Sequence, residues 1–184
     1  MSTGTPLRAD AARNRERVVE VARRHLLEHG LPFPMNALAR SAGVGVGTVY
    51  RHFPTQEALL EAIALPGLRA LTGEVRAAAA LEEPAAALRA VLAAALARLR
   101  ADAGLAAVLA ATGFPGADRA ELVRELQAGT EEVLERARRA GAVRAGIGAD
   151  DVRRLLCGVD HAVRSGGDDR TAPYLDVLVA GLRG

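Results

Sequence analysis

A cluster of hydrogen-bond donors is the feature of this sequence best suited to chemistry with a partner. The donors are a hydroxyl, a phenol, a guanidinium and an imidazole, carried by Thr48, Tyr50, Arg51 and His52. They fall within about one and a half turns of a predicted helix that begins near Val46. Such groups suit contacts with phosphate oxygens, while Val46 and Gly47 would face base edges. The positive dipole end of the helix also favours nearby phosphate.

The residues around this cluster have the sizes that a helix-turn-helix requires. Within Ala37–Phe53, Ala39 is small where two helices would cross, and Val49 would close the core. Gly43 can adopt the positive φ of a tight turn between the two helices. The second helix of such a unit enters the major groove of DNA with its N-terminal residues towards the bases. The alternative is a helical hairpin with a polar outer face and no DNA contact.

Two other groups of residues could do chemistry, and both have structural explanations. His25-Leu-Leu-Glu-His29 matches the His-x-x-Glu-His pattern of inverted zinc peptidases, with both imidazoles on one helical face. Packing of His25 and the negative helix end near His29 explain the same pattern without a metal. The second group consists of Cys157, Asp160 and His161. Their spacing fits a metal site, a redox switch, the edge of an effector pocket or a simply buried cysteine. We expect no catalysis, no cofactor and no metal.

Composition and charge favour an all-α protein with a basic N-terminal part. Half of the 184 residues are hydrophobic and 3% are aromatic, so we expect helices packed through small aliphatic side chains. The 24 basic residues are all arginine, and the formal net charge is +2. Residues 1–53 hold eight arginines against four acidic residues, which places the excess positive charge where DNA binding is predicted. A single cysteine excludes an intrachain disulfide.

Glycine and proline residues divide the first third of the chain into short predicted helices. Residues 1–9 are expected to form a flexible arm, after which Asp10 caps a first helix that ends at Gly30. Three short helices are predicted next, over residues 35–42, 46–53 and 55–64. Several short helices in so few residues indicate a small trihelical unit.

Longer amphipathic helices are predicted beyond Pro66. Pro84 opens one helix, and its apolar face consists of Leu88, Val91, Leu92, Ala95, Leu96 and Leu99. The apolar face of the next consists of Leu122, Leu126, Val133, Leu134 and Ala137. Two further helices, joined by the turn-like residues 165–168, are predicted to form an αα-hairpin. Their apolar residues are Val152, Leu155, Leu156, Val159, Val163, Leu175, Leu178, Val179 and Leu182. The predicted fold is all-α, an N-terminal three-helix helix-turn-helix domain followed by a C-terminal helical bundle.

The motifs around the donor cluster resemble the N-terminal domain of TetR-family transcriptional regulators. The similarity covers about residues 13–63 and is carried by Ala39–Arg40, Ala42–Val44, Gly47–Phe53 and Glu57–Leu60. A looser similarity to the SbtR-like subgroup is carried by Gly43–Thr55, Ala140–Arg144, Asp150–Val152 and Tyr174–Leu182. The resemblance implies that Thr48, Tyr50 and His52 contact the DNA backbone. It implies base contacts from Asn36, Val46 and Gly47.

Two residues depart from the pattern of the family. Gly45 stands where the family commonly has a serine or threonine that caps the recognition helix, and glycine is a weaker cap. Gln56 stands where the family has a basic residue on phosphate, and glutamine donates without a charge. Val46 and Gly47 cannot make the bidentate base contacts that polar side chains make. The residues that could supply such contacts are Asn36, Arg40 and an arm carrying Arg8 and Arg13.

The resemblance also implies a division of labour along the chain. Residues 10–64 would bind DNA, and residues 65–184 would bind an effector and dimerise through the last two long helices. Pocket candidates are Leu92, Leu105, Leu109, Phe114, Leu126 and His161, for each of which ordinary core packing is the alternative. Small residues that would let the dimer helices approach are Gly158, Ala162, Ala180 and Gly181. We predict a homodimeric, sequence-specific DNA-binding regulator, a repressor released from a palindromic operator by an unknown small-molecule effector.

The sequence lacks the apolar segments that would place the protein in or across a membrane, and it leaves two alternative functions open. No apolar run approaches the roughly 20 residues that span a bilayer, and Met1–Arg8 has no apolar signal-peptide core. We therefore expect a cytoplasmic protein without a membrane partner. One rival is a helical metal-dependent enzyme that uses His25 and His29. The other is a protein-binding module that has lost DNA recognition, which Gly45 and Gln56 would favour.

Overall fold

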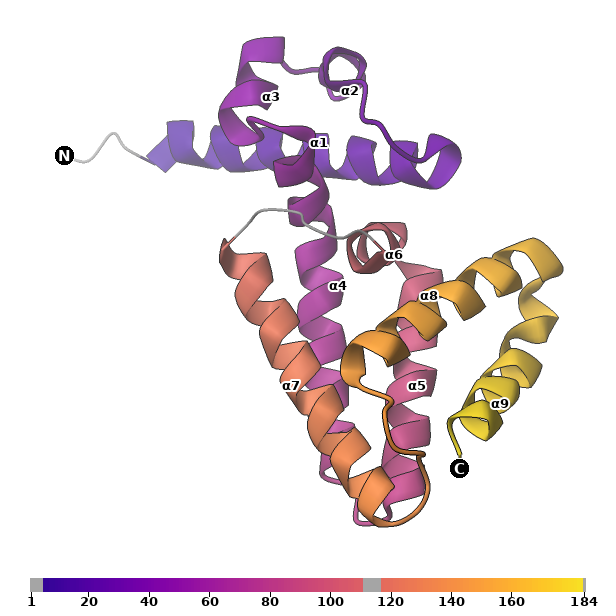
Figure 1. Ribbon diagram of the computed structural model, residues 1–184. Helices are drawn as coiled ribbons and strands as arrows, with labels where there is room; N and C mark the ends of the chain where they lie inside the picture. The colour runs from indigo at the N-terminus through magenta and orange to yellow at the C-terminus, as the bar shows by residue number, and fades with distance from the viewer. Residues whose placement is uncertain (1–4, 111–116, 184) are drawn as a thin grey trace. The chain divides into compact units, whose positions relative to one another are not determined.

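A computed structural model describes residues 5–110 and 117–183 of the chain (Figure 1). Across these residues the secondary structure consists of helices and their connections, with no strand, which confirms the predicted all-α class. The chain forms two compact units, Met1–Ala64 and Leu65–Gly184. The first unit contains α1 (Thr5–His29), α2 (Met35–Ser41), α3 (Val46–His52) and the start of α4 (Gln56–Ala79). The second contains the rest of α4, then α5 (Pro84–Ala101), α6 (Ala103–Ala110), α7 (Ala117–Arg139), α8 (Ala149–Gly166), the 3-10 helix η1 (Asp168–Arg170) and α9 (Thr171–Leu182).

The first unit is a small helical core around α1, α2 and α3, which pack against one another in pairs. Ala39 and Val49 are completely buried there, as their sizes predicted. The other fully or nearly fully buried apolar residues of this unit include Val18, Ala22, Phe33, Leu38, Phe53, Leu59, Leu60 and Ile63. Burying each large side chain stabilises the fold by about 1.5–3 kcal/mol, so this core holds the short helices that could not persist alone.

Two predicted helix boundaries are wrong. The first helix begins at Thr5, so Asp10 lies inside α1, where it pairs with Arg13 one turn later. Pro6 falls in the first turn, where a missing N–H leaves no intrahelical bond unmade. The helix predicted to stop before Pro66 continues as α4 to Ala79. The proline costs about 3 kcal/mol or more, but fully buried apolar side chains on both sides of it favour the continuous helix.

The second unit is built around α5, which packs against α6, α7, α8 and α9. The predicted apolar face of α5 is confirmed, since all six of its members are buried. Pro84 is the first residue of this helix, and the Glu83 carboxylate caps it by accepting from the backbone N–H groups of Ala85, at 2.9 Å, and Ala86. The predicted αα-hairpin is also present, because α8 packs against α9 with η1 between them.

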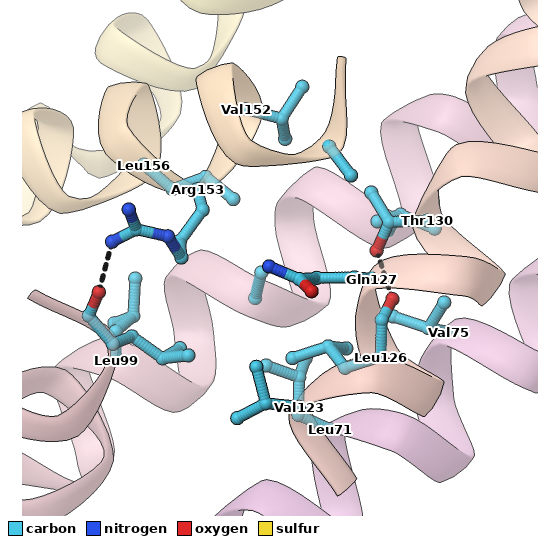
Figure 2. Close-up of a pocket in the computed structure, with 14 residues that line it drawn as sticks. Leu71, Val75, Leu99, Val123, Leu126, Gln127, Thr130, Val152, Arg153 and Leu156 are labelled. Atoms are coloured by element: carbon cyan, nitrogen blue, oxygen red, sulfur yellow. Dashed lines mark hydrogen bonds between the residues drawn. The ribbon is translucent and has the colours of Figure 1, made fainter. Parts of the chain in front are cut away.

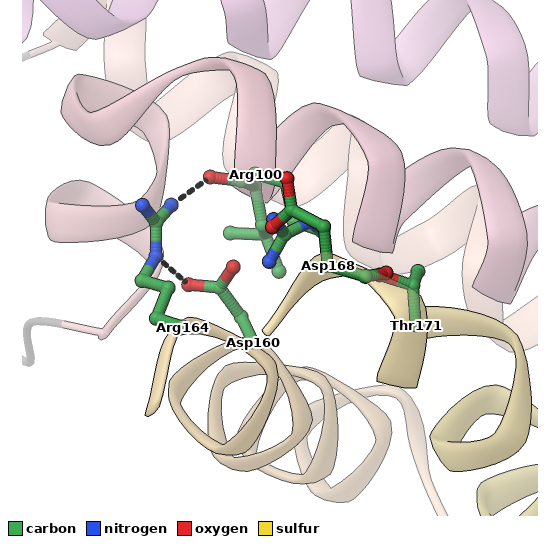
Figure 3. A network of polar contacts seen from close by, with 6 residues as sticks. Arg100, Asp160, Arg164, Asp168 and Thr171 are labelled. Atoms are coloured by element: carbon green, nitrogen blue, oxygen red, sulfur yellow. Dashed lines mark hydrogen bonds and ion pairs between the residues drawn. The ribbon is translucent and has the colours of Figure 1, made fainter. Parts of the chain in front are cut away.

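A polar network ties the turn of this hairpin to the end of α5 (Figure 3). Arg164 on α8 donates to Asp160 at 2.8 Å and to the backbone oxygen of Leu99 at 2.6 Å. Arg100 pairs with Asp168 of η1. The carbonyl of Asp168 also accepts from the Thr171 hydroxyl, at 2.8 Å. The last carbonyls of a helix have no intrahelical partner, so Arg164 both satisfies α5 and positions α8.

Candidate nucleic-acid interface and effector cavity

The turn between α2 and α3 is set by its backbone. Gly43 has a φ of +63°, its N–H bonds to the carbonyl of Arg40 at 3.1 Å, and the N–H of Val44 bonds to that of Ala39 at 3.0 Å. These two bonds form a Schellman motif, which satisfies the last carbonyls of α2. Gly45 then begins α3 without a side-chain cap. A sharp, fixed turn of this kind sets the direction in which α3 leaves the core.

Replacing Gly43 with alanine is expected to destabilise the protein by about 1–2 kcal/mol, because a Cβ is unfavourable in the left-handed region. The site itself is open, with no atom within 4 Å of an added Cβ, so backbone strain is isolated from crowding. Gly47→Ala is the matched control, since that site is equally open but helical, and alanine there should stabilise by about 0.5–1 kcal/mol. Denaturant unfolding measures both, and shifts of the same sign would contradict the role of the turn.

Helix α3 has one anchored side and one free side. Val49 is completely buried, and Phe53, which ends the helix, is 1% exposed. The exposed residues of α3 include Val46, 39% exposed, and Tyr50, 45% exposed. Gly47 and Arg51 are exposed as well, whereas Thr48 and His52 are half-buried. The donors singled out in the sequence therefore come from a helix whose other face is fixed in the core.

The side chains of Arg51 and Thr48 are hydrogen-bonded to each other on α3. The Arg51 Nε donates to the carbonyl of Gly47 at 3.2 Å, and its Nη2 donates to the Thr48 hydroxyl at 3.3 Å. The guanidinium stays exposed while these bonds hold it along the helix. The remaining N–H groups of the fork can meet a phosphate, because arginine carries five donors.

The polar candidates outside α3 have different surroundings. Asn36 and Arg40 are exposed on α2. The side-chain carbonyl of Gln56 accepts from the backbone N–H of Phe33 at 2.7 Å, which ties the connection before α2 to the first turn of α4. Sequence reasoning missed this structural task of Gln56, which leaves only its amide group for a partner. Sequence reasoning also missed a contact of Arg15, whose guanidinium lies 5.2 Å from the centre of the buried Phe53 ring.

An apolar cavity lies within the second unit (Figure 2). Aliphatic side chains of α4, α5, α7 and α8 and Leu109 of α6 form its walls, and its volume is about 50 Å³. Gln127, Thr130 and Arg153 are the polar residues among those that line it. This space is small, since specific ligand pockets hold about 300–1,000 Å³. A ligand of ordinary size would therefore have to widen it.

Both parts of the chain match family models. Residues 83–184 match the C-terminal domain of SbtR-like transcriptional regulators, and residues 18–63 match the bacterial regulatory proteins of the tetR family. This chain belongs to the TetR family of transcriptional regulators. The solved TetR regulator SCO0520 from Streptomyces coelicolor is 32% identical to it, with 92% of this chain and 98% of that one covered and a TM-score of 0.54.

The other similarities to this TetR-family protein are either low in sequence identity or confined to a short part of the chain. AibR, solved with isovaleryl coenzyme A and operator DNA, is 18% identical at a TM-score of 0.67, over 92% of this chain and 98% of that one, and shows the fold alone. A helix-turn-helix-type transcriptional regulator of Staphylococcus aureus strain USA300 is 44% identical over 48 residues, which are 26% of each protein. The match thus spans about a quarter of the length of the curated relatives.

The cavity of this TetR-family protein is lined by only part of the predicted pocket set. Leu109 and Leu126 line it. Leu92 and Leu105 do not line it; both are completely buried, in agreement with the core packing given as their alternative. His161 is an exposed residue of α8 away from the cavity, and Phe114 lies outside the described residues. Sequence reasoning missed Gln127, Thr130 and Arg153. For Thr130 the spacing of four residues from Leu126 on α7 was an available signal, and for Gln127 the same spacing from Val123.

The histidine pair of α1 is arranged as a stack. The rings of His25 and His29 lie 4.8 Å apart at 15°, and His25 also lies against Phe33, with ring centroids 6.2 Å apart. Within the described ranges, no three histidine, cysteine or acidic side chains are grouped so as to hold a metal ion. Structural zinc takes four ligands and catalytic zinc three. The packing explanation of His25 thus has direct contacts behind it, and the metal-enzyme alternative has only the spacing.

Cys157 is half-buried on α8, and burial raises the pKa of its thiol above the ordinary value. Arg153 opposes this shift and Asp160 adds to it. A raised pKa leaves less thiolate at neutral pH, and the thiolate is the reactive form. The redox alternative for this residue is therefore disfavoured.

The outer faces of α8 and α9 form a shared apolar surface, which we call the hairpin face. It consists of Leu155, Gly158, Val159, Ala162, Tyr174, Val177, Leu178 and Gly181, and Arg144, Arg154 and Leu182 line the same hollow. Val177 is 70% exposed and Leu155 is 42% exposed, although both are apolar. Gly158 and Gly181 have no atom within 4 Å of where a Cβ would lie, so the backbone is accessible there. Exposed apolar side chains beside accessible backbone are typical of surfaces that meet another protein.

Among the helices described, none combines the length and the apolarity that crossing a membrane requires.

Proposed function

We propose that this protein is a sequence-specific DNA-binding regulator that acts in the cytoplasm as a homodimeric repressor and leaves a palindromic operator when a small-molecule effector binds. The observation that carries this proposal is the arrangement of α3, which Val49 anchors in the core while Val46, Tyr50 and Arg51 face outwards. A helix held on one side and furnished with donors on the other is suited to the major groove.

The side chains divide into two tasks on DNA. Thr48, Tyr50, Arg51 and His52 contact phosphates, and the amide group of Gln56 adds a neutral donor. Val46 and Gly47 lie at the start of α3, closest to the bases, where the valine methyl groups can meet a thymine methyl. Asn36 and Arg40 supply the hydrogen bonds to base edges that Val46 and Gly47 cannot make. The excess of arginine over acidic residues in residues 1–53 adds a salt-dependent attraction.

Dimerisation through the hairpin face explains why the operator would be palindromic. A two-fold dimer presents two copies of α3, which read half-sites about 34–36 Å apart. The exposed Leu155 and Val177 would be covered in this dimer, and Gly158 and Gly181 would let the facing helices approach. Repression follows where such an operator overlaps a promoter.

The effector would release the protein from its operator by shifting the population between two arrangements of the protein. An effector lowers operator affinity only if it binds more tightly to the arrangement that does not fit DNA. The apolar cavity is the candidate site, with Leu109 and Leu126 in its wall. Related proteins of the same fold have been solved with small molecules, namely AibR with isovaleryl coenzyme A and SmeT with triclosan.

Selection of bound genomic fragments by the purified full chain tests this function. We expect enrichment of a palindromic site at low salt, with affinity falling steeply as salt rises. A library in which no sequence is enriched at low salt would overturn the proposal and favour the protein-binding module. Enrichment of a site without two-fold symmetry would contradict the dimeric arrangement while leaving DNA binding in place.

A further inference from the structure

The wall of the effector cavity points to the chemistry of its ligand. Apart from Gln127, Thr130 and Arg153, every residue that lines the cavity is apolar (Figure 2). The Thr130 hydroxyl donates to the carbonyl of Leu126 at 2.8 Å, so its hydrogen is already engaged. Among the described residues Arg153 is the one charged member of the wall, and a ligand buried here is mostly in contact with aliphatic groups.

Arg153 carries two kinds of contact at the edge of this cavity. Its Nε and Nη2 bond to the Asp150 carboxylate at 2.9 and 2.7 Å. Its Nη1 donates to the backbone oxygen of Leu109, near the end of α6. The Asp150 carboxylate balances the charge of the guanidinium, which in turn lowers the pKa of that carboxyl group below its ordinary value. Asp150, which also pairs with Arg154, thus offsets part of the charge of Arg153, and the bond from Arg153 to Leu109 goes to a neutral acceptor.

The bond from Arg153 to Leu109 is one that a ligand carbonyl group can replace, because both acceptors are neutral oxygens. Leu109 is the last residue but one of α6, and its carbonyl accepts from Arg153. Once released from Arg153, that oxygen can be hydrated. The cavity of about 50 Å³ holds only one or two water molecules, so any larger occupant must move part of the wall. Separating Leu109 from Arg153 opens the wall at a polar contact rather than between two packed apolar faces.

We propose, on the basis of the effector site proposed above, that the cavity binds a small aliphatic molecule with a neutral carbonyl group, and that Arg153 selects this group by donating a hydrogen bond to its oxygen in place of the Leu109 oxygen. A ligand carboxylate is disfavoured because it would share Arg153 with Asp150 and lose its own hydration. A pure hydrocarbon is disfavoured because it would displace the Leu109 oxygen and leave a guanidinium donor unpaired.

Three probes of equal carbon number separate these cases on the full-length protein. They are methyl butyl ketone, hexanoate and hexane. We expect the ketone to bind roughly tenfold or more tightly than either of the others, by calorimetry or by displacement of a fluorescent apolar dye. Tightest binding of hexanoate, equal binding of ketone and hexane, or binding of none of the three would overturn the inference.

Arg153→Met tests whether Arg153 makes the selection. Asp150 keeps Arg154 as a partner and is partly exposed, so the substitution leaves no buried charge unpaired. We expect the preference for ketone over hexane to disappear in Arg153→Met and to persist in the control Arg154→Met, which removes a neighbouring arginine that does not line the cavity. A preference that survives in Arg153→Met would overturn the assignment. The comparison of probes on the wild-type chain decides the ligand class even if a variant fails to fold.

The outcomes for ligand and DNA are independent. If the ketone binds selectively but no operator is found, the function as a DNA-binding repressor fails and the ligand inference stands. If an operator is bound and none of the probes enters the cavity, the ligand inference fails and the DNA-binding function stands.

Discussion

Tyr50→Ala is expected to lower operator affinity by about a hundredfold or more without unfolding the protein. A hydrogen bond to a charged group such as phosphate is worth about 1.5–3 kcal/mol. A two-fold dimer makes the contact twice, and about 1.4 kcal/mol corresponds to a tenfold change in affinity. Because Tyr50 is 45% exposed, its removal creates no large cavity in the core. Fluorescence anisotropy with the selected operator at fixed salt measures the loss.

Two further variants identify the cause of the Tyr50 effect. Tyr50→Phe keeps the ring and removes the hydroxyl, so it should show most of the loss if the phenol contacts a phosphate. Leu27→Ala removes an exposed apolar side chain on α1, outside the predicted set of DNA contacts, and should bind the operator normally. Wild-type affinity in Tyr50→Ala, with the fold intact by circular dichroism, would show that this side of α3 does not meet DNA.

Gly158→Arg is expected to convert the dimer to monomers and to lower operator affinity by about a hundredfold or more. The added side chain has open space in one protomer, and arginine forms helix better than glycine, so folding should not suffer. In the dimer it would hold the hairpin faces apart. Without a linked second half-site, the effective concentration that couples the two copies of α3 is lost. Sedimentation equilibrium and operator titration measure the two effects.

Gly73→Arg is the matched control for this variant. Gly73 is also an exposed helical glycine of the second unit with no atom within 4 Å of an added Cβ, but it lies on α4, outside the hairpin face. It should remain dimeric and bind the operator as the wild type does. A dimer that persists in Gly158→Arg would place the interface on another surface.

The helix-turn-helix could be predicted almost completely from the sequence because its constraints are local. Gly43 provides the positive φ of the turn, and the spacing of Ala39 and Val49 fixes which side of each helix is buried. Local rules were less successful where long-range packing decides. Pro66 suggested a helix end, yet apolar residues that are fully buried on both sides keep α4 continuous.

The residues that line the cavity could not be predicted from the sequence for a related reason. Periodicity identifies the apolar face of a helix but not which of its members border an unfilled space. Leu92 and Leu99 are both buried on α5, yet Leu99 lines the cavity and Leu92 does not. Arg153 could not be recognised either, because its partners combine a local one, Asp150, with the backbone of Leu109, 44 residues away.

By itself, the sequence determined the all-α class, the helix-turn-helix with its outward donors, and the apolar residues of the α8–α9 hairpin, since these depend on residue types and on spacing along one or two helices. Only the tertiary structure decided what surrounds each side chain. It joined Arg51 to Thr48, gave Gln56 a structural bond, stacked His25 on His29, and placed Arg153 between the cavity and α6. Apart from the local Arg51–Thr48 bond and the stack one helical turn apart, such contacts join residues distant in the chain, and the packing of whole helices selects them rather than any local preference.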